Sequence, residues 1–297
     1  MIYTIQNESL RVEVNSYGAE LWSLTEKQEG KQYLWQGDAS IWELRAPVIF
    51  PYCGRLKDFK YRDEDGVWHT EQQNHGFARF MDHDLKEKTE DSVTLILRDN
   101  EETWEKYPYH FTFETCYRLE GATLHCIHRV KNTGERKMPF NLGYHPGFFC
   151  PFSDEYQTGD YEIRFEQRET PIQLESEDDG QLRTGKETIR FRDQNVMPLS
   201  DGMFPKNFCL TGLKSKYLDL VEKPTGRFIR VSIDGFQNVV FWSKPGKLHF
   251  LCVEPWTGCP DSVDSTFDLW EKRDIQTLEP GAEYAADSSV SIGGKSR

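Results

Sequence analysis

The chain has 297 residues and a formal net charge of −13, and 37% of its residues are hydrophobic and 13% aromatic. Such a composition can bury a sizeable core, which argues against global disorder. The acidic balance and the lack of a basic patch argue against a nucleic-acid-binding protein.

The N-terminal sequence and the cysteines indicate the compartment. No basic segment followed by an apolar run starts at Met1, and no stretch approaches ~18 uninterrupted apolar residues, so we expect neither a signal peptide nor a membrane span. The cysteines number seven, an odd count, and none form a C-x-x-C pair. Scattered reduced thiols are typical of a cytoplasmic protein, and a structural zinc site is not expected.

Alternating apolar residues predict β-strands along much of the chain. Residues 10–14 and 93–97 alternate, and residues 111–118 and 124–130 flank a turn at 119–122, which is a hairpin signature. Further candidate strands are residues 228–233, 239–242 and 249–253, with glycine and proline turn signals between them. The main periodic signal is therefore that of strands.

Helical signals are weak. Residues 38–47 and 100–107 are predicted as single helical turns, and the polar stretch 175–188 as a solvated loop. Many short strands without helices between them predict an all-β protein, an antiparallel sandwich or barrel. Since no linker or repeat interrupts the chain, we expect residues 1–297 to form a single domain.

Four segments contain residues that ordinary β turns do not need: FPYCGRLKD, NHGFAR, NLGYHPGF and CVEPWTG. In the last segment, strand alternation puts Glu254 on the same face as Cys252, and Pro255 is expected to end the strand. Partial burial would raise the pKa of the Glu254 carboxyl and make it a competent base. The alternative is a surface glutamate at a strand end.

Two histidines and two arginines stand out in the other segments. His145 and His75 lie in glycine-containing turns, where a near-neutral pKa suits proton transfer, although each could be a structural histidine bonded to a loop carbonyl. Arg55 and Arg79 each follow a glycine-containing turn. A guanidinium can bind sugar hydroxyls, carboxylates or phosphate, and the alternative is a surface ion pair.

Three aromatic side chains are candidates for the walls of a binding pocket. Trp256, Phe148 and Trp242 could provide flat apolar faces for the C–H groups of a sugar. Core packing is the alternative, and it is favoured for Trp242.

Together, the four segments in this order resemble the aldose 1-epimerase superfamily, and most closely its LacX-like branch, which is related to the hexose-6-phosphate mutarotases. The resemblance runs from Met1 to about Ala286. It implies one large antiparallel β-supersandwich of the galactose mutarotase type. It also implies an isomerase that interconverts the α and β anomers of an aldohexose or hexose 6-phosphate, with no metal or cofactor.

The resemblance also assigns roles to individual residues. Glu254 matches the general base of the family and His145 its general acid. His75 and Arg55 match residues that contact the sugar. Arg79 matches an arginine that helps to bind phosphate in the phosphosugar relatives.

One position departs from the pattern. Family members often carry a substrate-binding aspartate where Asn207 aligns here, and Asp201 is a second candidate nearby. An amide can hold a hydroxyl but carries no charge, so this departure affects the expected substrate preference more than the reaction. Trp256 completes the predicted binding residues.

Two other functions are compatible with parts of the pattern. One is a non-catalytic carbohydrate-binding or sugar-sensing protein on the same scaffold. The other is a polysaccharide lyase, for which a helical toroid domain and an export signal would be expected, and the sequence shows neither. The partner is expected to be a small sugar or sugar phosphate, without nucleic acid or membrane, and either a monomer or a homodimer fits.

Overall fold

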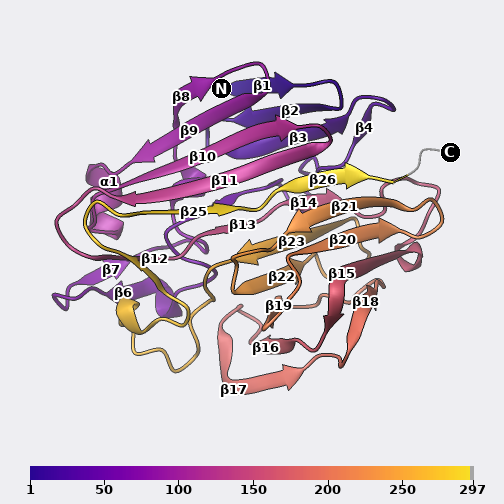
Figure 1. Cartoon of the computed structure of the whole chain (residues 1–297). Coiled ribbons are helices and arrows are strands. Elements are labelled where there is room, and N and C mark those ends of the chain that lie inside the picture. The colour runs from indigo at the N-terminus through magenta and orange to yellow at the C-terminus, as the bar shows by residue number, and fades with distance from the viewer. Residues whose placement is uncertain (295–297) are drawn as a thin grey trace.

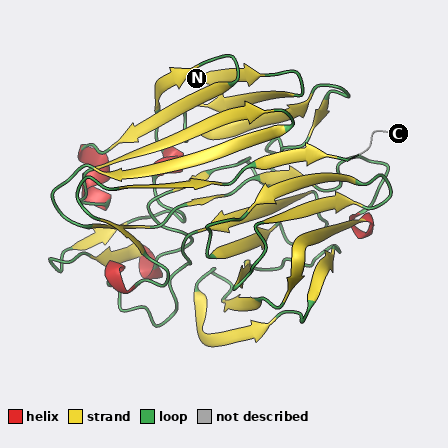
Figure 2. Ribbon diagram, viewed as in Figure 1, coloured by secondary structure: helices red, strands yellow, loops and turns green. Residues whose placement is uncertain are grey.

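The computed structural model describes residues 1–294, which form antiparallel β-sheets connected by loops and very short helices (Figures 1 and 2). The all-β class and the antiparallel arrangement predicted from the alternating residues are confirmed. None of the helices in the described part of the chain is long and apolar enough to cross a membrane.

The larger of the two main sheets has ten strands. In spatial order these are β18 (Gln194–Pro198), β15 (Tyr161–Glu169), β20 (Tyr217–Glu222), β21 (Arg227–Ser232), β26 (Val290–Gly293), β11 (Thr123–Asn132), β10 (Phe111–Glu120), β9 (Ser92–Arg98) and β8 (Asp84–Lys88), with β25 (Glu283–Asp287) also paired to β11. The predicted hairpin is β10 and β11, which pair from Phe111 opposite Asn132 to Glu120 opposite Thr123.

The second main sheet has eight strands, and its strand β23 carries Glu254 and Trp256. Its order is β17 (Leu182–Ile189), β16 (Ile172–Ser176), β19 (Phe208–Thr211), β22 (Asn238–Trp242), β23 (Phe250–Trp256), β13 (Gly143–Tyr144) and β5 (Val48–Ile49), with β14 (Gly147–Phe149) also paired to β23. Strand β23 is thus an inner strand, flanked by β22 on one side and by β13 and β14 on the other.

Smaller elements complete the fold. A four-stranded sheet holds β1 (Ile2–Gln6), β2 (Leu10–Asn15), β3 (Glu20–Glu26) and β4 (Lys31–Gln32), and two-stranded pairs join β12 (Met138–Phe140) to β24 (Gln276–Leu278) and β6 (Lys60–Arg62) to β7 (Trp68–Thr70). The helices are α1 (Glu101–Lys106) and the 3-10 turns η1 (Lys57–Phe59), η2 (Ala78–Phe80), η3 (Thr158–Asp160) and η4 (Leu269–Glu271).

The main core lies between the two large sheets. The alternation of β23 sends Leu251 and Val253 into the largest buried hydrophobic cluster, which also contains Tyr117 of β10 and Leu220 of β20. Because side chains alternate along a strand, Glu254 must face away from this core. The strand pattern of the sequence therefore separates a packing face from a face that carries the chemistry.

Three local predictions are wrong. Residues 38–47 form a turn closed by a bridge between Asp38 and Trp42 instead of a helical turn. The stretch 175–188, expected as a loop, contains most of β17, although its side chains after Leu182 are exposed. Strand β23 continues through Pro255 to Trp256, because ladders on both sides hold it: Pro255 lies opposite Val239, and Trp256 opposite Gly143.

Candidate active site

Strand register brings the predicted acid and base together. Gly143 pairs with Trp256 and Gly147 with Cys252 across the same two chain segments. The same register, continued through the break between β13 and β14, places His145 directly opposite Glu254. Directly opposed residues of an antiparallel pair have Cβ atoms ~4.5–5.5 Å apart, so their side chains meet.

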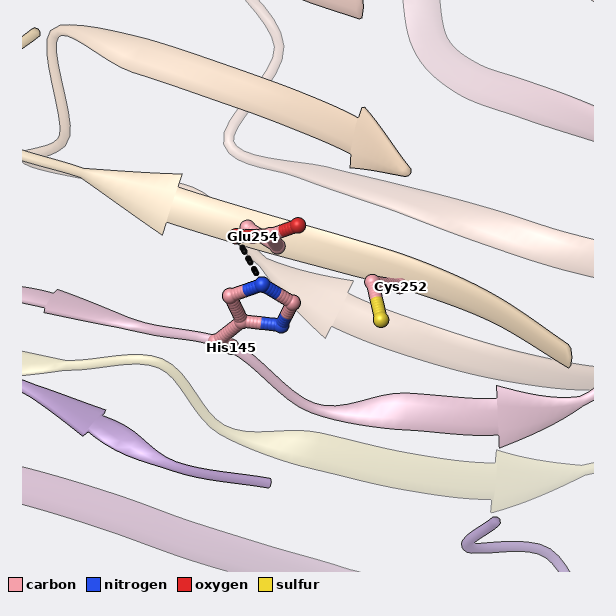
Figure 3. A group of neighbouring side chains, drawn as sticks. All are labelled: His145, Cys252 and Glu254. Atoms are coloured by element: carbon pink, nitrogen blue, oxygen red, sulfur yellow. Dashed lines mark ion pairs between the residues drawn. The ribbon is translucent and has the colours of Figure 1, made fainter. Parts of the chain in front are cut away.

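The two side chains do meet, and both are buried (Figure 3). The Nε2 atom of His145 lies 3.2 Å from Oε2 of Glu254, and the Glu254 side chain is 1% exposed. Within residues 1–294, the two carboxylate oxygens of Glu254 have no hydrogen-bond partner. The Nδ1 atom of His145 has none in this part of the chain either. Since buried polar atoms are nearly always paired in folded proteins, these unpaired atoms make the pair a candidate for contact with a ligand.

A cavity of about 220 Å³ opens over this pair. That volume is below the range of ~300–1,000 Å³ typical of drug-sized ligands, which suits a small molecule. Its lining includes all seven site residues predicted from the sequence: Arg55, His75, Arg79, His145, Asn207, Glu254 and Trp256. Segments far apart in the chain therefore converge on one pocket.

His75 occupies an unusual backbone conformation at the cavity wall. Its φ is +69°, in the left-handed region that non-glycine residues rarely adopt and that is often found at functional sites. The backbone N–H of Gly54 donates to its Nδ1 atom at 3.2 Å. Because Nδ1 accepts this bond, the neutral ring carries its proton on Nε2 and can donate from there.

Aromatic rings hold the His145 imidazole in place. Trp42 stacks on it with ring centroids 5.3 Å apart, and His75 and Trp242 meet it edge to face at 5.4 and 5.8 Å. Trp42 and Trp242 also line the cavity. Trp242 is thus a wall residue and not only a core residue, whereas Phe148, also predicted as a wall, is fully buried in the main core.

Burial governs the protonation of the pair. It raises the pKa of Glu254 well above its ordinary range, and the neighbouring indole of Trp256 and then the charge of Arg79 offset only part of that rise. Burial, together with the same guanidinium, lowers the pKa of His145 to about 3. Both changes favour the uncharged forms of the two groups, a protonated carboxyl and a neutral imidazole.

Arg79 is itself an unusual cation. Desolvation lowers its pKa to about 10, while the carboxyls of Glu20, Glu254 and Glu71 act in the opposite direction. Its Nε atom is buried and has no partner within residues 1–294. The guanidinium therefore lines the cavity with at least one N–H donor, Nε–H, that has no acceptor in the described chain.

Arg55 and Asn207 also line the cavity, and both are partly exposed. Arg55 is 3.8 Å from the Asp179 carboxylate and stacks over Phe59, so it has features of both a surface ion pair and a pocket residue. Asn207 precedes β19 and lines the cavity. Asp201, the second candidate for the missing aspartate, lines a different cavity and accepts from Leu248 N–H at 2.9 Å.

Several lining residues were not singled out in the sequence: Trp42, Leu44, Gly54, Asn74 and Gly180. Asn74 and Gly54 lie inside two of the four segments, so proximity in the sequence could have identified them. Trp42 lies in a stretch whose local structure was predicted wrongly, and Gly180 lies in the loop between β16 and β17. No spacing or motif marks either of them.

Comparisons with known proteins agree with this architecture. The sequence profile of the aldose 1-epimerase family matches residues 1–291. The chromosomal LacX protein of Lactococcus lactis subsp. lactis is 32% identical over 286 residues, which cover 94% of this chain and 95% of that protein. The similarity thus extends over nearly the whole chain.

Solved structures show the same arrangement of strands. A galactose mutarotase related enzyme from Lactobacillus acidophilus superimposes with a TM-score of 0.93 at 30% identity, covering 99% of this chain and 97% of that one. A galactose mutarotase-like protein from Lactobacillus casei gives a TM-score of 0.89 at 27% identity, covering 99% and 100%. The predicted supersandwich of the galactose mutarotase type is therefore confirmed.

Proposed function

The chain belongs to the aldose 1-epimerase family, and on that premise we propose that it is a mutarotase, which interconverts the α and β anomers of an aldohexose or hexose 6-phosphate. The observation that carries the proposal is the contact between Glu254 and His145 at 3.2 Å in a small cavity. A carboxylate and an imidazole so placed can act together on two oxygens of one sugar ring.

The reaction begins with the proton of the uncharged Glu254 carboxyl. Sugar hydroxyls that donate to Glu254 stabilise its carboxylate form, and this drives the proton toward His145 across the 3.2 Å contact. Glu254 then takes the proton of the anomeric hydroxyl while His145 protonates the ring oxygen. The C1–O5 bond breaks, and the open-chain aldehyde forms.

Ring closure reverses these transfers. Rotation about C1–C2 turns the other face of the carbonyl toward the C5 hydroxyl, which loses its proton to His145 as the bond reforms. Glu254 returns its proton to the anomeric oxygen, so the pair ends in its starting state. The net change is the configuration at C1 alone.

The other lining residues supply binding and orientation. The Nε2–H of His75 and the amide of Asn207 suit sugar hydroxyls, and the indole rings of Trp256 and Trp242 suit the C–H faces of a pyranose. Arg55 and Arg79 supply guanidinium donors for hydroxyls or for a 6-phosphate. A phosphate-bearing substrate is supported by two arginines in so small a cavity.

We also propose a cytoplasmic location. All seven cysteines fall within residues 1–294, and each is a free thiol there. Unpaired buried thiols are typical of proteins that live in a reducing compartment.

The direct test is anomer exchange, measured by NMR on glucose, galactose and their 6-phosphates. Glu254→Gln and His145→Gln should each slow exchange by roughly 10²–10⁴-fold, because each removes one of two proton carriers. Glu254→Gln should leave thermal stability equal or higher, because it removes a buried ionisable group whose oxygens have no hydrogen-bond partner in the described chain.

Matched controls come from the same fold. Glu71 is a buried glutamate with a raised pKa due to desolvation, and His83 is a buried histidine; neither lines the cavity. Glu71→Gln and His83→Gln should therefore keep exchange within a few fold of wild type. If the wild-type protein binds these sugars without accelerating exchange, it is a sugar-binding protein and the proposal is wrong.

A further inference from the structure

A third reactive side chain adjoins the proton-transferring pair, and the mechanism above does not use it. The Sγ atom of Cys252, a nitrogen of His145 and a carboxylate oxygen of Glu254 all lie within 4.8 Å of one another. Figure 3 shows the sulfur beside the imidazole, on the same side of β23 as the glutamate. All three residues are buried.

Strand geometry creates this cluster. Cys252 and Glu254 are two positions apart on β23 and share a face, and His145 lies opposite Glu254 and diagonal to Cys252. The residue directly opposite Cys252 is Gly147, which has no side chain to separate the sulfur from the ring. A Cβ added at Gly147 would meet the sulfur at 3.5 Å.

Thiolate, imidazole and carboxylate are the three protein donors that zinc prefers. Zn–S bonds of ~2.3 Å and Zn–N or Zn–O bonds of ~2.0–2.2 Å put tetrahedral donors roughly 3.3–3.6 Å apart. The three atoms lie within 4.8 Å of one another, so any pair needs to approach by at most roughly 1.2–1.5 Å, which side-chain rotations supply. The cavity leaves a fourth position for water or a sugar hydroxyl.

We propose that Cys252, His145 and Glu254 bind a Zn²⁺ ion, and that this ion inhibits the protein by occupying both proton carriers. The carboxylate oxygens of Glu254 have no other partner in the described chain, so they are free to coordinate. Bound metal ties up the carboxylate and the imidazole, and sugar and metal therefore compete.

The charge balance makes Cys252 the deciding ligand. Arg79 acts on Glu254 and His145 as a nearby positive charge and opposes the entry of a dication. A carboxylate alone supplies one compensating negative charge, and the thiolate formed on metal binding supplies the second. Without the sulfur, the site keeps one anion and two ligands beside a guanidinium.

The first test measures binding without reference to activity. The sugar-free protein is titrated with Zn²⁺ by calorimetry and with Cd²⁺ by its ultraviolet thiolate charge-transfer band. We expect one equivalent to bind, with the band present. Cys252→Ser and Cys252→Ala should weaken Zn²⁺ binding by roughly tenfold or more and abolish the band.

Control variants separate this site from other thiols and from misfolding. Cys116→Ser changes a half-buried cysteine on β10, which belongs to the other main sheet, and should bind Zn²⁺ like wild type. Glu254→Gln keeps the thiol and should also weaken binding. Equal affinity in wild type and both Cys252 variants, or wild-type binding weaker than millimolar, would overturn the proposal.

The second test rests on the proposed function and measures inhibition. Zn²⁺ should slow anomer exchange, a chelator should restore it, and sugar should raise the Zn²⁺ concentration needed. Cys252→Ser should keep its exchange rate in Zn²⁺ while Cys116→Ser loses it. If the protein has no exchange activity but the binding results hold, the mutarotase proposal fails and the metal site stands.

Discussion

At the scale of single residues, Arg79 acts on both of the proposed proton carriers, Glu254 and His145. Its charge lowers the pKa of Glu254 and that of His145. In Arg79→Gln both pKa values should rise, so both limbs of the pH profile of kcat should move to higher pH. NMR exchange at saturating sugar across the pH range measures this shift.

Arg55→Gln is the matched control for Arg79. Arg55 also lines the cavity, but its charge is not among the causes of the pKa shift of either proton carrier. It should raise KM and leave both limbs in place. If both limbs of the pH profile also stay in place in Arg79→Gln, then Arg79 binds substrate but does not set the pKa values of the pair.

Motif residues were predictable, and wall residues were not. Glu254, His145 and His75 lie in short segments whose order is specific, and the cavity gathers all of them. Trp42 could not be assigned because its position depends on a turn folding onto His145 and Phe250, which are distant in the sequence. The sequence around a tryptophan in a polar turn does not indicate which aromatic ring the tryptophan will contact in the folded protein.

At the scale of elements, β14 and β23 pack closely against the turn that contains Trp42. This close packing limits which residue can occupy position 147. A Cβ at Gly147 would lie 2.7 Å from Cζ3 of Trp42 and 3.3 Å from the Arg45 carbonyl oxygen. Gly147→Ala should therefore push Trp42 off His145 and into the cavity. We expect a higher KM, a lower kcat and a loss of roughly 1–3 kcal/mol of stability.

Steady-state exchange kinetics and thermal denaturation measure these effects. Gly159→Ala is the control, because an added Cβ there meets no atom within 4 Å. It should leave the kinetics unchanged. Wild-type kinetics in Gly147→Ala would show that Trp42 does not shape the site.

Elements with strong periodicity were predicted well, and those held by neighbours were not. The β10–β11 hairpin follows from two amphipathic strands and a short turn. Strand β17 has mostly exposed side chains, so its sequence lacks alternation, and pairing with β16 is what makes it a strand. Pro255 is tolerated because two flanking strands hold β23 despite one missing donor.

At the scale of the whole molecule, buried histidines link stability to pH. Burial lowers the pKa of His83 to about 4 and that of His128 to about 3. In the unfolded chain a histidine titrates near ~6.5. The unfolded state therefore binds more protons below that pH, and these residues reduce the free energy of unfolding as the pH falls from about 6.5 toward 4.

His83→Gln isolates one such group. Relative to wild type, its free energy of unfolding should rise as the pH falls, by roughly 3 kcal/mol between pH ~6.5 and ~4. Between pH ~7 and ~8 the difference should be constant, which is the internal control. Urea denaturation at each pH measures it, and parallel curves throughout would show that His83 titrates normally when folded.

The strand order suggests that the described chain is one folding unit. Strand β11, from the middle of the sequence, pairs with β25 and β26 near its end, and β26 pairs in turn with β21. The largest buried cluster draws on residues from Ile5 to Ile292. We infer a single domain, since no boundary divides this core.

The spacing of Glu254 and His145 is set by a backbone ladder, whereas Trp42, Arg55, His75 and Asn207 reach the cavity from turns and loops. Substitutions in the turns and loops can therefore change the cavity wall without changing the distance between Glu254 and His145. Under the proposed function, replacing these loops would change which sugar the cavity accepts, and the geometry of the Glu254–His145 pair would stay the same.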